Sequence, residues 1–177
     1  MNEETIKRFF EALDTLPSGD RVALKRAAGI MLEDANGRAI RIFYQCLPHA
    51  VAQWQESRWF AAGCLHCLWD ANTKGRVRLV QALYQLGLDA NISESMGHRL
   101  ENLLDLTWER DGYMLTKLGR LIKLVRSKAI AIDCEDLLRD LIYWNSDSQR
   151  VQRKWARGLY GKSEDEETER KETHHAL

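Results

Sequence analysis

Apolar side chains recur every three to four residues along almost the whole chain, which is the spacing of one face of an α-helix. In residues 3–14 this spacing puts Ile6, Phe9, Phe10 and Leu13 on a single face. Only two prolines interrupt the 177 residues, and Leu, Ala, Arg, Glu and Lys dominate a composition with few β-branched runs. These residues favour helix over strand. No stretch alternates regularly enough to indicate a sheet, so the sequence predicts an all-α fold.

The interruptions of this pattern predict roughly nine helices. One helix opens within LPSGDRVALKRAAG, where Ser18 or Asp20 is a candidate N-cap and Gly29 a candidate end. Asp133, with Asp136 behind it, is typical of another helix start. The remaining helices are expected at 3–14, 38–46, 50–69, 76–86, 94–107, 111–127, 133–144 and 148–160.

The polar stretch LDANISES, residues 88–95, is the best internal boundary. It predicts an N-terminal helical half, 1–88, and a C-terminal helical half, 92–162. The last fifteen residues, 163–177, hold six acids against two bases, so the other 162 residues hold 24 Lys and Arg against 20 Asp and Glu. The net charge of zero therefore conceals a modestly basic body. A charged tail with so little apolar surface is expected to be disordered.

The segment TKLGRLIKLVRSK, residues 116–128, carries five basic side chains and no acid. Four of them share one side of a helical wheel, opposite the apolar positions: Lys117, Arg120, Lys123 and Arg126. An ordinary exposed face mixes charges, because Glu–Lys pairs four residues apart stabilise a helix. Here no acid offsets the repulsion among these four positive side chains, which favours an anionic partner such as nucleic acid. The alternative is that nearby acids balance the charge; the candidates are Asp133, Glu135 and Asp136.

The last predicted helix repeats this arrangement. Its basic side chains share one face, opposite Val151, Trp155 and Leu159; they are Arg150, Arg153, Lys154 and Arg157. A row of Lys and Arg neutralises phosphates and releases their counterions, which gives salt-sensitive binding without reading base sequence. Aromatic residues are not interleaved with these charges, so the pattern favours tracking of a backbone over stacking on single-stranded bases. A further basic cluster lies in the first half: Arg21, Lys25 and Arg26.

The motif CLHC, from Cys64 to Cys67, has the spacing of a metal knuckle or a redox pair. A structural zinc site needs a second pair of ligands, and a redox pair normally follows a strand; the sequence has neither. The motif lies within an apolar helical stretch, where reduced Cys behaves as a small hydrophobe. We therefore expect core packing, with His66 on the more polar side, and keep a metal or redox site as the alternative.

Nothing in the sequence indicates an enzyme or a cofactor, because the histidines are scattered and no phosphate-binding glycine loop is present. The six tryptophans lie mostly at apolar helical positions and are expected to pack between helices. No apolar run reaches the length of a bilayer span, and the N-terminal segment MNEETIKRFF lacks a secretory apolar region. A cytoplasmic protein that makes no contact with membranes is expected.

Three stretches are similar to a known family: SESMGHRLENLLDL, LTKLGRLIKLVRSKAIAIDCEDLLRDLIYWN and VQRKWARGLY. Their order and spacing resemble the CasB family, the small subunit of the type I-E CRISPR surveillance complex Cascade. The stretch LPSGDRVALKRAAG resembles the family's early segment, so the likeness spans residues 16–160. Two positions depart from the family pattern: Gly119 stands where a second Arg often precedes Arg120, and Cys134 stands where apolar residues are usual.

This resemblance implies an all-helical, non-catalytic subunit, two copies of which stack head to tail beside the other Cascade subunits. It implies contact with the guide RNA (crRNA) and both strands of target DNA, whose R-loop the subunit stabilises in antiviral defence. The positions that match the family's basic residues are Lys25, Arg26, Arg99, Arg120, Arg153 and Arg157. The charge pattern alone adds Lys117, Lys123, Arg126, Arg150 and Lys154. The alternative function is a helical protein–protein scaffold without affinity for nucleic acid.

Overall fold

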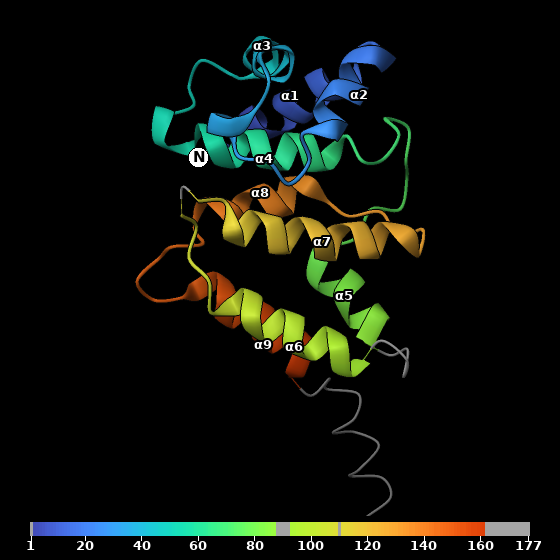
Figure 1. Cartoon of the computed structure of the whole chain (residues 1–177), viewed down its shortest axis with the longest axis vertical. Helices are drawn as coiled ribbons and strands as arrows, with labels where there is room; N and C mark the ends of the chain where they lie inside the picture. Colours follow the sequence, from blue (N-terminus) through green and yellow to red (C-terminus); the bar gives the residue numbers. More distant parts are fainter. Residues whose placement is uncertain (1, 88–92, 110, 162–177) are drawn as a thin grey trace, which may run out of the picture.

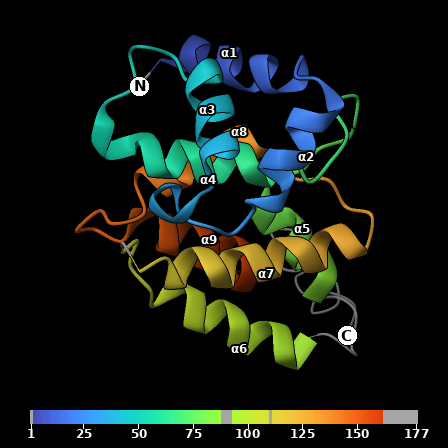
Figure 2. The ribbon, with the colours of Figure 1, turned by 45° about the horizontal axis from the view of Figure 1, so that its top comes forward.

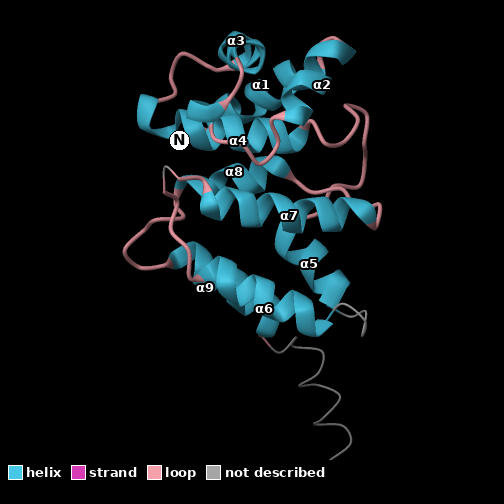
Figure 3. Ribbon diagram, viewed as in Figure 1, coloured by secondary structure: helices cyan, strands magenta, loops and turns pink. Residues whose placement is uncertain are grey.

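The computed structural model describes residues 2–87, 93–109 and 111–161, and within these ranges it contains nine α-helices and no strand (Figures 1 and 3). The first helices are α1 (Glu3–Asp14), α2 (Ser18–Arg26), α3 (Gly37–Cys46) and α4 (Glu56–His66), with 3₁₀ turns η1 (Leu32–Asp34) and η2 (Gln53–Gln55). The others are α5 (Leu79–Gly87), α6 (Ser93–Leu104), α7 (Tyr113–Ser127), α8 (Cys134–Ile142) and α9 (Arg150–Tyr160). The predicted all-α fold is thereby confirmed, whereas the predicted boundary around 88–92 and the predicted tail, 163–177, lie outside the described residues.

The helix ends follow local chemistry, with one correction. Asp133 caps α8 as predicted, because its carboxylate accepts the backbone N–H groups of Glu135 and Asp136 at 2.9 and 3.1 Å. The predicted N-cap of α2 is wrong. Pro17 takes that position without a side-chain hydrogen bond, and the fixed φ of proline, here −55°, suits a helix entry. Gly29 ends the turn after α2 with φ of +93°, a conformation that glycine adopts without strain.

Helix α4 is the centre of the fold. The predicted stretch 50–69 is longer than the helix, because η2 occupies its start and the chain turns away after His66. Every residue from Trp59 to His66 is buried, which is the pattern of a helix enclosed on all sides. Helix α4 packs against α1, α2, α7 and α8, and the α4–α8 pair has the most extensive contact.

The helices form stacked layers along the long axis of the molecule. In Figure 1, α1 to α4 lie at one end, α7 and α8 cross the middle, and α5, α6 and α9 lie at the other end. A single buried cluster includes side chains from all nine described helices, among them Trp59, Trp144 and Trp155. The division into two helical halves therefore stays a prediction, since the core is continuous across the layers.

Candidate nucleic-acid interface

Helix α7 presents the basic side that the sequence predicts. Its opposite side is buried from Met114 to Val125, which fixes the rotation of the helix. Arg120, Lys123 and Arg126 are exposed, and none of them has an acidic group within 4.0 Å among the described residues. Lys117 is half-buried, with its ammonium 5.0 Å from the centre of the Tyr113 ring. We call these four residues the α7 row.

The acids close to α7 in sequence do not balance the α7 row. Asp133 caps α8, Glu135 lies 3.7 Å from the guanidinium of Arg139, and Asp136 lies 3.7 Å from that of Arg78. The alternative in which these carboxylates neutralise the basic helix is therefore not supported. The α7 row remains an uncompensated cationic surface within the described part of the chain.

The turn after α2 meets α7 through a close glycine contact. A Cβ added at Gly119 would lie 3.4 Å from the Cα of Gly29, so the two backbones nearly touch. This contact explains why Gly119 does not carry the second Arg that the family pattern suggests: Gly119 is buried, and a long side chain has no space there. Lys25 and Arg26, at the end of α2, are exposed and lie three to four residues before Gly29, which touches the helix that carries the α7 row. Figure 2 shows the chain of α2 running toward α7.

Arg21, the third member of the predicted N-terminal cluster, has a different role. Its guanidinium donates to the carbonyl oxygens of Leu13 and Trp69 at 2.7 and 2.9 Å and to the carboxylate of Asp14 at 3.0 Å. These bonds connect α2 to the end of α1 and to the chain after α4. Arg21 is thus part of the internal framework, and its charge is not presented to solvent as those of Lys25 and Arg26 are.

Helix α9 carries a second set of cations, which we call the α9 row: Arg150, Arg153 and Arg157. All three are exposed, and the guanidinium of Arg150 lies 4.9 Å from the centre of the Tyr143 ring. The indole of Trp155 is buried and packs edge-on against Trp144, with ring centres 5.1 Å apart. This contact sets the rotation of α9 and turns its basic face outward.

Lys154 lies among these cations but is held by acids of α8. Its ammonium donates to both carboxylate oxygens of Asp140, at 2.8 and 3.1 Å, and lies 3.7 Å from Asp136. Asp140 is 6% exposed and also accepts the indole N–H of Trp155 at 2.7 Å. Burial raises the pKa of Asp140, although the hydrogen bonds from Lys154 and Trp155 act in the opposite direction. The charge of Lys154 is thus largely balanced by Asp140 and Asp136 within the chain.

The α7 row and the α9 row are carried by two different helices. Helix α5 packs against both α7 and α9, and Figure 2 shows α9 behind α7. Arg99, the remaining predicted residue, is exposed on α6, which packs against α5 and α7. The predicted residues therefore lie on four helices, α2, α6, α7 and α9.

Exposed tyrosines accompany the cations, which the sequence interpretation missed. All five tyrosines of the chain are exposed, and the rings of Tyr113 and Tyr143 lie under Lys117 and Arg150. The expectation that aromatic rings stand apart from the basic residues is wrong for these two sites. The contact of Tyr113 with Lys117 could have been predicted, because residues four apart are neighbours on a helix. The Tyr143–Arg150 contact depends on the turn between α8 and α9.

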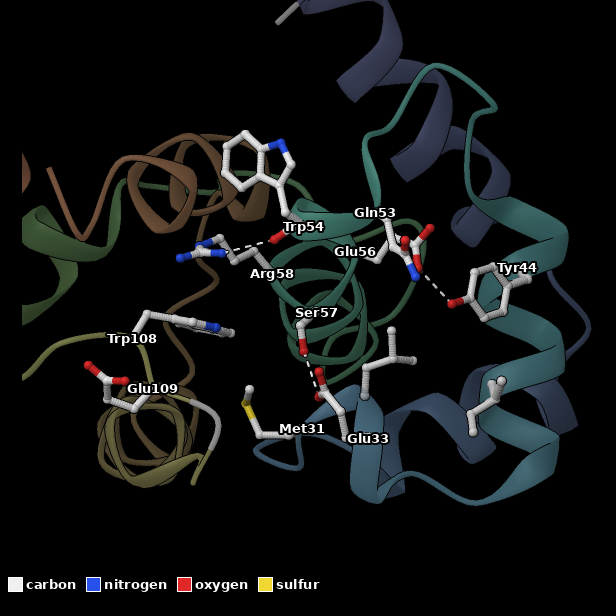
Figure 4. Close-up of a pocket in the computed structure, with 12 residues that line it drawn as sticks. Met31, Glu33, Tyr44, Gln53, Trp54, Glu56, Ser57, Arg58, Trp108 and Glu109 are labelled. Atoms are coloured by element: carbon white, nitrogen blue, oxygen red, sulfur yellow. Dashed lines mark hydrogen bonds between the residues drawn. The ribbon is translucent and has the colours of Figure 1, made fainter.

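An open groove of about 850 Å³ lies between η1, α3, η2, the start of α4 and the segment before α7 (Figure 4). Trp54 is 63% exposed, which makes it an exception to the predicted packing of tryptophans between helices, because it lies in the η2 turn. Arg58 lies between Trp54 and Trp108, 5.9 and 5.4 Å from the two ring centres. Three carboxylates are also part of the lining: Glu33, Glu56 and Glu109.

The motif CLHC packs in the core. Cys64 and Cys67 are buried free thiols, and burial raises the pKa of Cys67 to about 12. His66 is buried, at 4% exposed, because α4 is enclosed on all sides, and its ring faces polar side chains. Its Nε2 bonds to Asp14 at 2.7 Å and its Nδ1 to the guanidinium of Arg76 at 3.2 Å. No group of three or more His, Cys, Asp or Glu in the described ranges is arranged to hold a metal ion.

Comparisons with known proteins agree with the fold. The sequence profile of the family described as CRISPR-associated protein Cse2 matches residues 20–160. A Cse2-family protein from Thermus thermophilus superposes with a TM-score of 0.71 at 26% identity, over 89% of this chain and 98% of that chain. CasB from M. ruber superposes with a TM-score of 0.68 at 22% identity, over 98% of both chains.

A chain of a CRISPR RNA-guided surveillance complex has the same fold, with a TM-score of 0.67 and 24% identity over 89% of this chain and 90% of that chain. No curated protein sequence matches the chain. None of the described helices is long and apolar enough to cross a bilayer. Because the family profile spans most of the sequence, from α2 to α9, the chain belongs to the Cse2 family of CRISPR-associated proteins, which confirms its resemblance to CasB.

Proposed function

We propose that this chain is the non-catalytic small subunit of a type I-E CRISPR RNA-guided surveillance complex, Cascade. In this role it binds nucleic-acid backbone through its basic helix faces and stabilises the R-loop between guide RNA and target DNA. Family membership and the similarity to a chain of a surveillance complex support this proposal. Its partners are the guide RNA, both strands of target DNA, the other subunits and a second copy of itself, in the cytoplasm.

The observation that carries the proposal is the α7 row. Exposed cations that lack nearby acids repel one another, and a row of phosphates removes that repulsion while releasing counterions. Formation of an R-loop exchanges one duplex for another of similar stability, so backbone contacts are enough to favour the open state. Contacts of this kind position a strand without reading its sequence, as a complex that delegates recognition to guide RNA requires.

The distribution of the cations over two helices supports contact with more than one strand. A paired strand and a displaced strand run apart in an R-loop, and the α7 row and α9 row lie on different helices, with α5 packed against both. The α7 row, extended by Lys25 and Arg26, provides one track. Arg150, Arg153 and Arg157 provide the other.

The test is the salt dependence of binding. Replacing Arg120, Lys123 and Arg126 with Gln should lower the magnitude of the slope of log K against log salt by about 2 to 3. Each lost phosphate contact removes about 0.7 to 0.9 from that slope. Binding is measured by fluorescence anisotropy with labelled single- and double-stranded DNA, and R-loop formation is measured in the reconstituted complex.

The matched control replaces Lys7, Arg8 and Arg41 with Gln, which removes the same charge from cations that lie near acids in the N-terminal helices. The control should keep the original slope. Equal slopes for the wild type and the α7 variant would refute the proposal, provided that circular dichroism shows an unchanged helix content.

A protein–protein scaffold is the second candidate, and the groove of Figure 4 favours it. A tryptophan that is 63% exposed beside three carboxylates is typical of a surface that receives a basic protein segment. The scaffold function predicts no affinity for DNA or RNA at low salt, so the same titration distinguishes it from the first proposal.

A further inference from the structure

A cavity of about 490 Å³ opens between α5 and α9, next to the α9 row. Helix α5 contributes Gln81, Tyr84 and Gln85, which share one helix face at three- and four-residue spacing. Helix α9 and the residue after it contribute Arg157, Gly158 and Gly161. No carboxylate lines this cavity among the described residues, in contrast to the groove of Figure 4.

Two glycines make up the α9 side of the cavity. A Cβ at Gly158 would lie 2.5 Å from a methyl carbon of Val80, so glycine is what allows α5 and α9 to approach. The α9 wall therefore consists of backbone and of the Arg157 side chain. A bare backbone wall leaves space for a flat group, and the facing ring of α5 is Tyr84, which is 43% exposed.

The polar groups of the cavity suit a nucleotide. The side-chain oxygen of Gln81 accepts the backbone N–H of Arg78 at 3.2 Å, so the carboxamide is held in place and its NH₂ group remains a donor. Gln85 is also exposed. Amide groups pair with the edges of unpaired bases, an aromatic face stacks on them, and a guanidinium binds the phosphate.

We propose that this cavity, the Tyr84 pocket, binds one unstacked nucleotide of a single strand, with its base on Tyr84 and its phosphate on Arg157. The proposal rests on the backbone binding proposed above, to which it adds a base-dependent contact. DNA and RNA share this chemistry, and the experiment separates them. It also explains why Tyr84 is exposed, although α5 buries its apolar side chains in the core.

The test compares short oligothymidylate with an abasic oligonucleotide of equal length, each labelled and titrated with the full chain at low salt. Stacking of one base predicts that wild type binds oligothymidylate at least about 5-fold more tightly than the abasic strand. Tyr84→Ala should bring this ratio to one while leaving affinity for the abasic strand unchanged, and Tyr84→Phe should restore the ratio. Oligouridylate in place of oligothymidylate shows whether RNA is preferred.

Tyr44→Ala is the matched control, because Tyr44 is 48% exposed and lies in the carboxylate-lined groove. Arg157→Gln should weaken binding of both strands, which reports the backbone contact alone. If Arg157→Gln weakens both strands while Tyr84→Ala leaves the ratio unchanged, the Tyr84 pocket is overturned and the proposed function stands. If wild type binds neither strand, both proposals fail.

Discussion

Lys154 and Arg153 are neighbours on α9, yet the structure predicts opposite effects when each loses its charge. The ammonium of Lys154 is bound to Asp140 at 2.8 Å, whereas Arg153 is exposed and has no acidic partner among the described residues. Replacing each with Met keeps the apolar stem and the helix propensity. Lys154→Met should lose stability, and Arg153→Met should lose affinity for nucleic acid.

The expected magnitudes follow from the contacts. Lys154→Met leaves a carboxylate whose side chain is 8% exposed with the indole N–H of Trp155 as its remaining donor. Hydrogen bonds to a charged group contribute about 1.5 to 3 kcal/mol, and because the Lys154 side chain is 44% exposed we expect a loss of about 1 to 2 kcal/mol. For a chain of this size the melting temperature should fall by about 2 to 8 °C. Arg153→Met should stay within about 0.5 kcal/mol.

The binding assay should show the reverse order. Arg153→Met should lower the slope of log K against log salt by about 0.7 for single-stranded DNA, and Lys154→Met should leave the slope nearly unchanged. The two measurements are urea or thermal unfolding followed by circular dichroism, and anisotropy titrations at several salt concentrations. A Lys154→Met variant that keeps its melting temperature and loses as much slope as Arg153→Met would refute the assignment of its charge to Asp140.

Three further predictions concern the packing and the buried polar groups. Gly158→Ala should destabilise the fold by about 1 to 2 kcal/mol in urea unfolding, because its Cβ meets Val80, and Val80→Ala should cost less in that background than in wild type. Burial lowers the pKa of His66, so the unfolded chain takes up the proton first and stability should fall below about pH 6.5, by at most about 1.4 kcal/mol per pH unit. His66→Gln should flatten this dependence, while His98→Gln, an exposed control, should not. Finally, a thiol reagent should label Cys46 alone in the native protein, since the other three thiols are buried. Labelling of all four thiols before unfolding would contradict this.

Much of the fold could be predicted from the sequence because helices are local structures. The apolar spacing of α1 places Ile6, Phe9, Phe10 and Leu13 in the core, and the structure confirms that all four are buried. Asp133 caps α8 because a short carboxylate reaches backbone N–H groups within the next three residues. The rotation of α7 was predictable for the same reason, since its apolar face must turn inward.

What surrounds each helix was decided by tertiary packing. His66 is buried beside Asp14, 52 residues away in the chain, so its environment has no signal in the spacing of α4. Lys154 and Arg153 are alike in the sequence, and only the approach of α8 gives one of them an acidic partner.

The sequence by itself therefore determined the helices, their inward faces and the presence of two basic rows, because these depend on residues three and four positions apart. The tertiary structure decided which of the described cations lack an acidic partner, how the turn after α2 reaches α7 through Gly29 and Gly119, and that Tyr84 shares a cavity with Arg157. These features depend on contacts between segments far apart in the chain, and burial or pairing of a charge is a property of the neighbours that packing supplies.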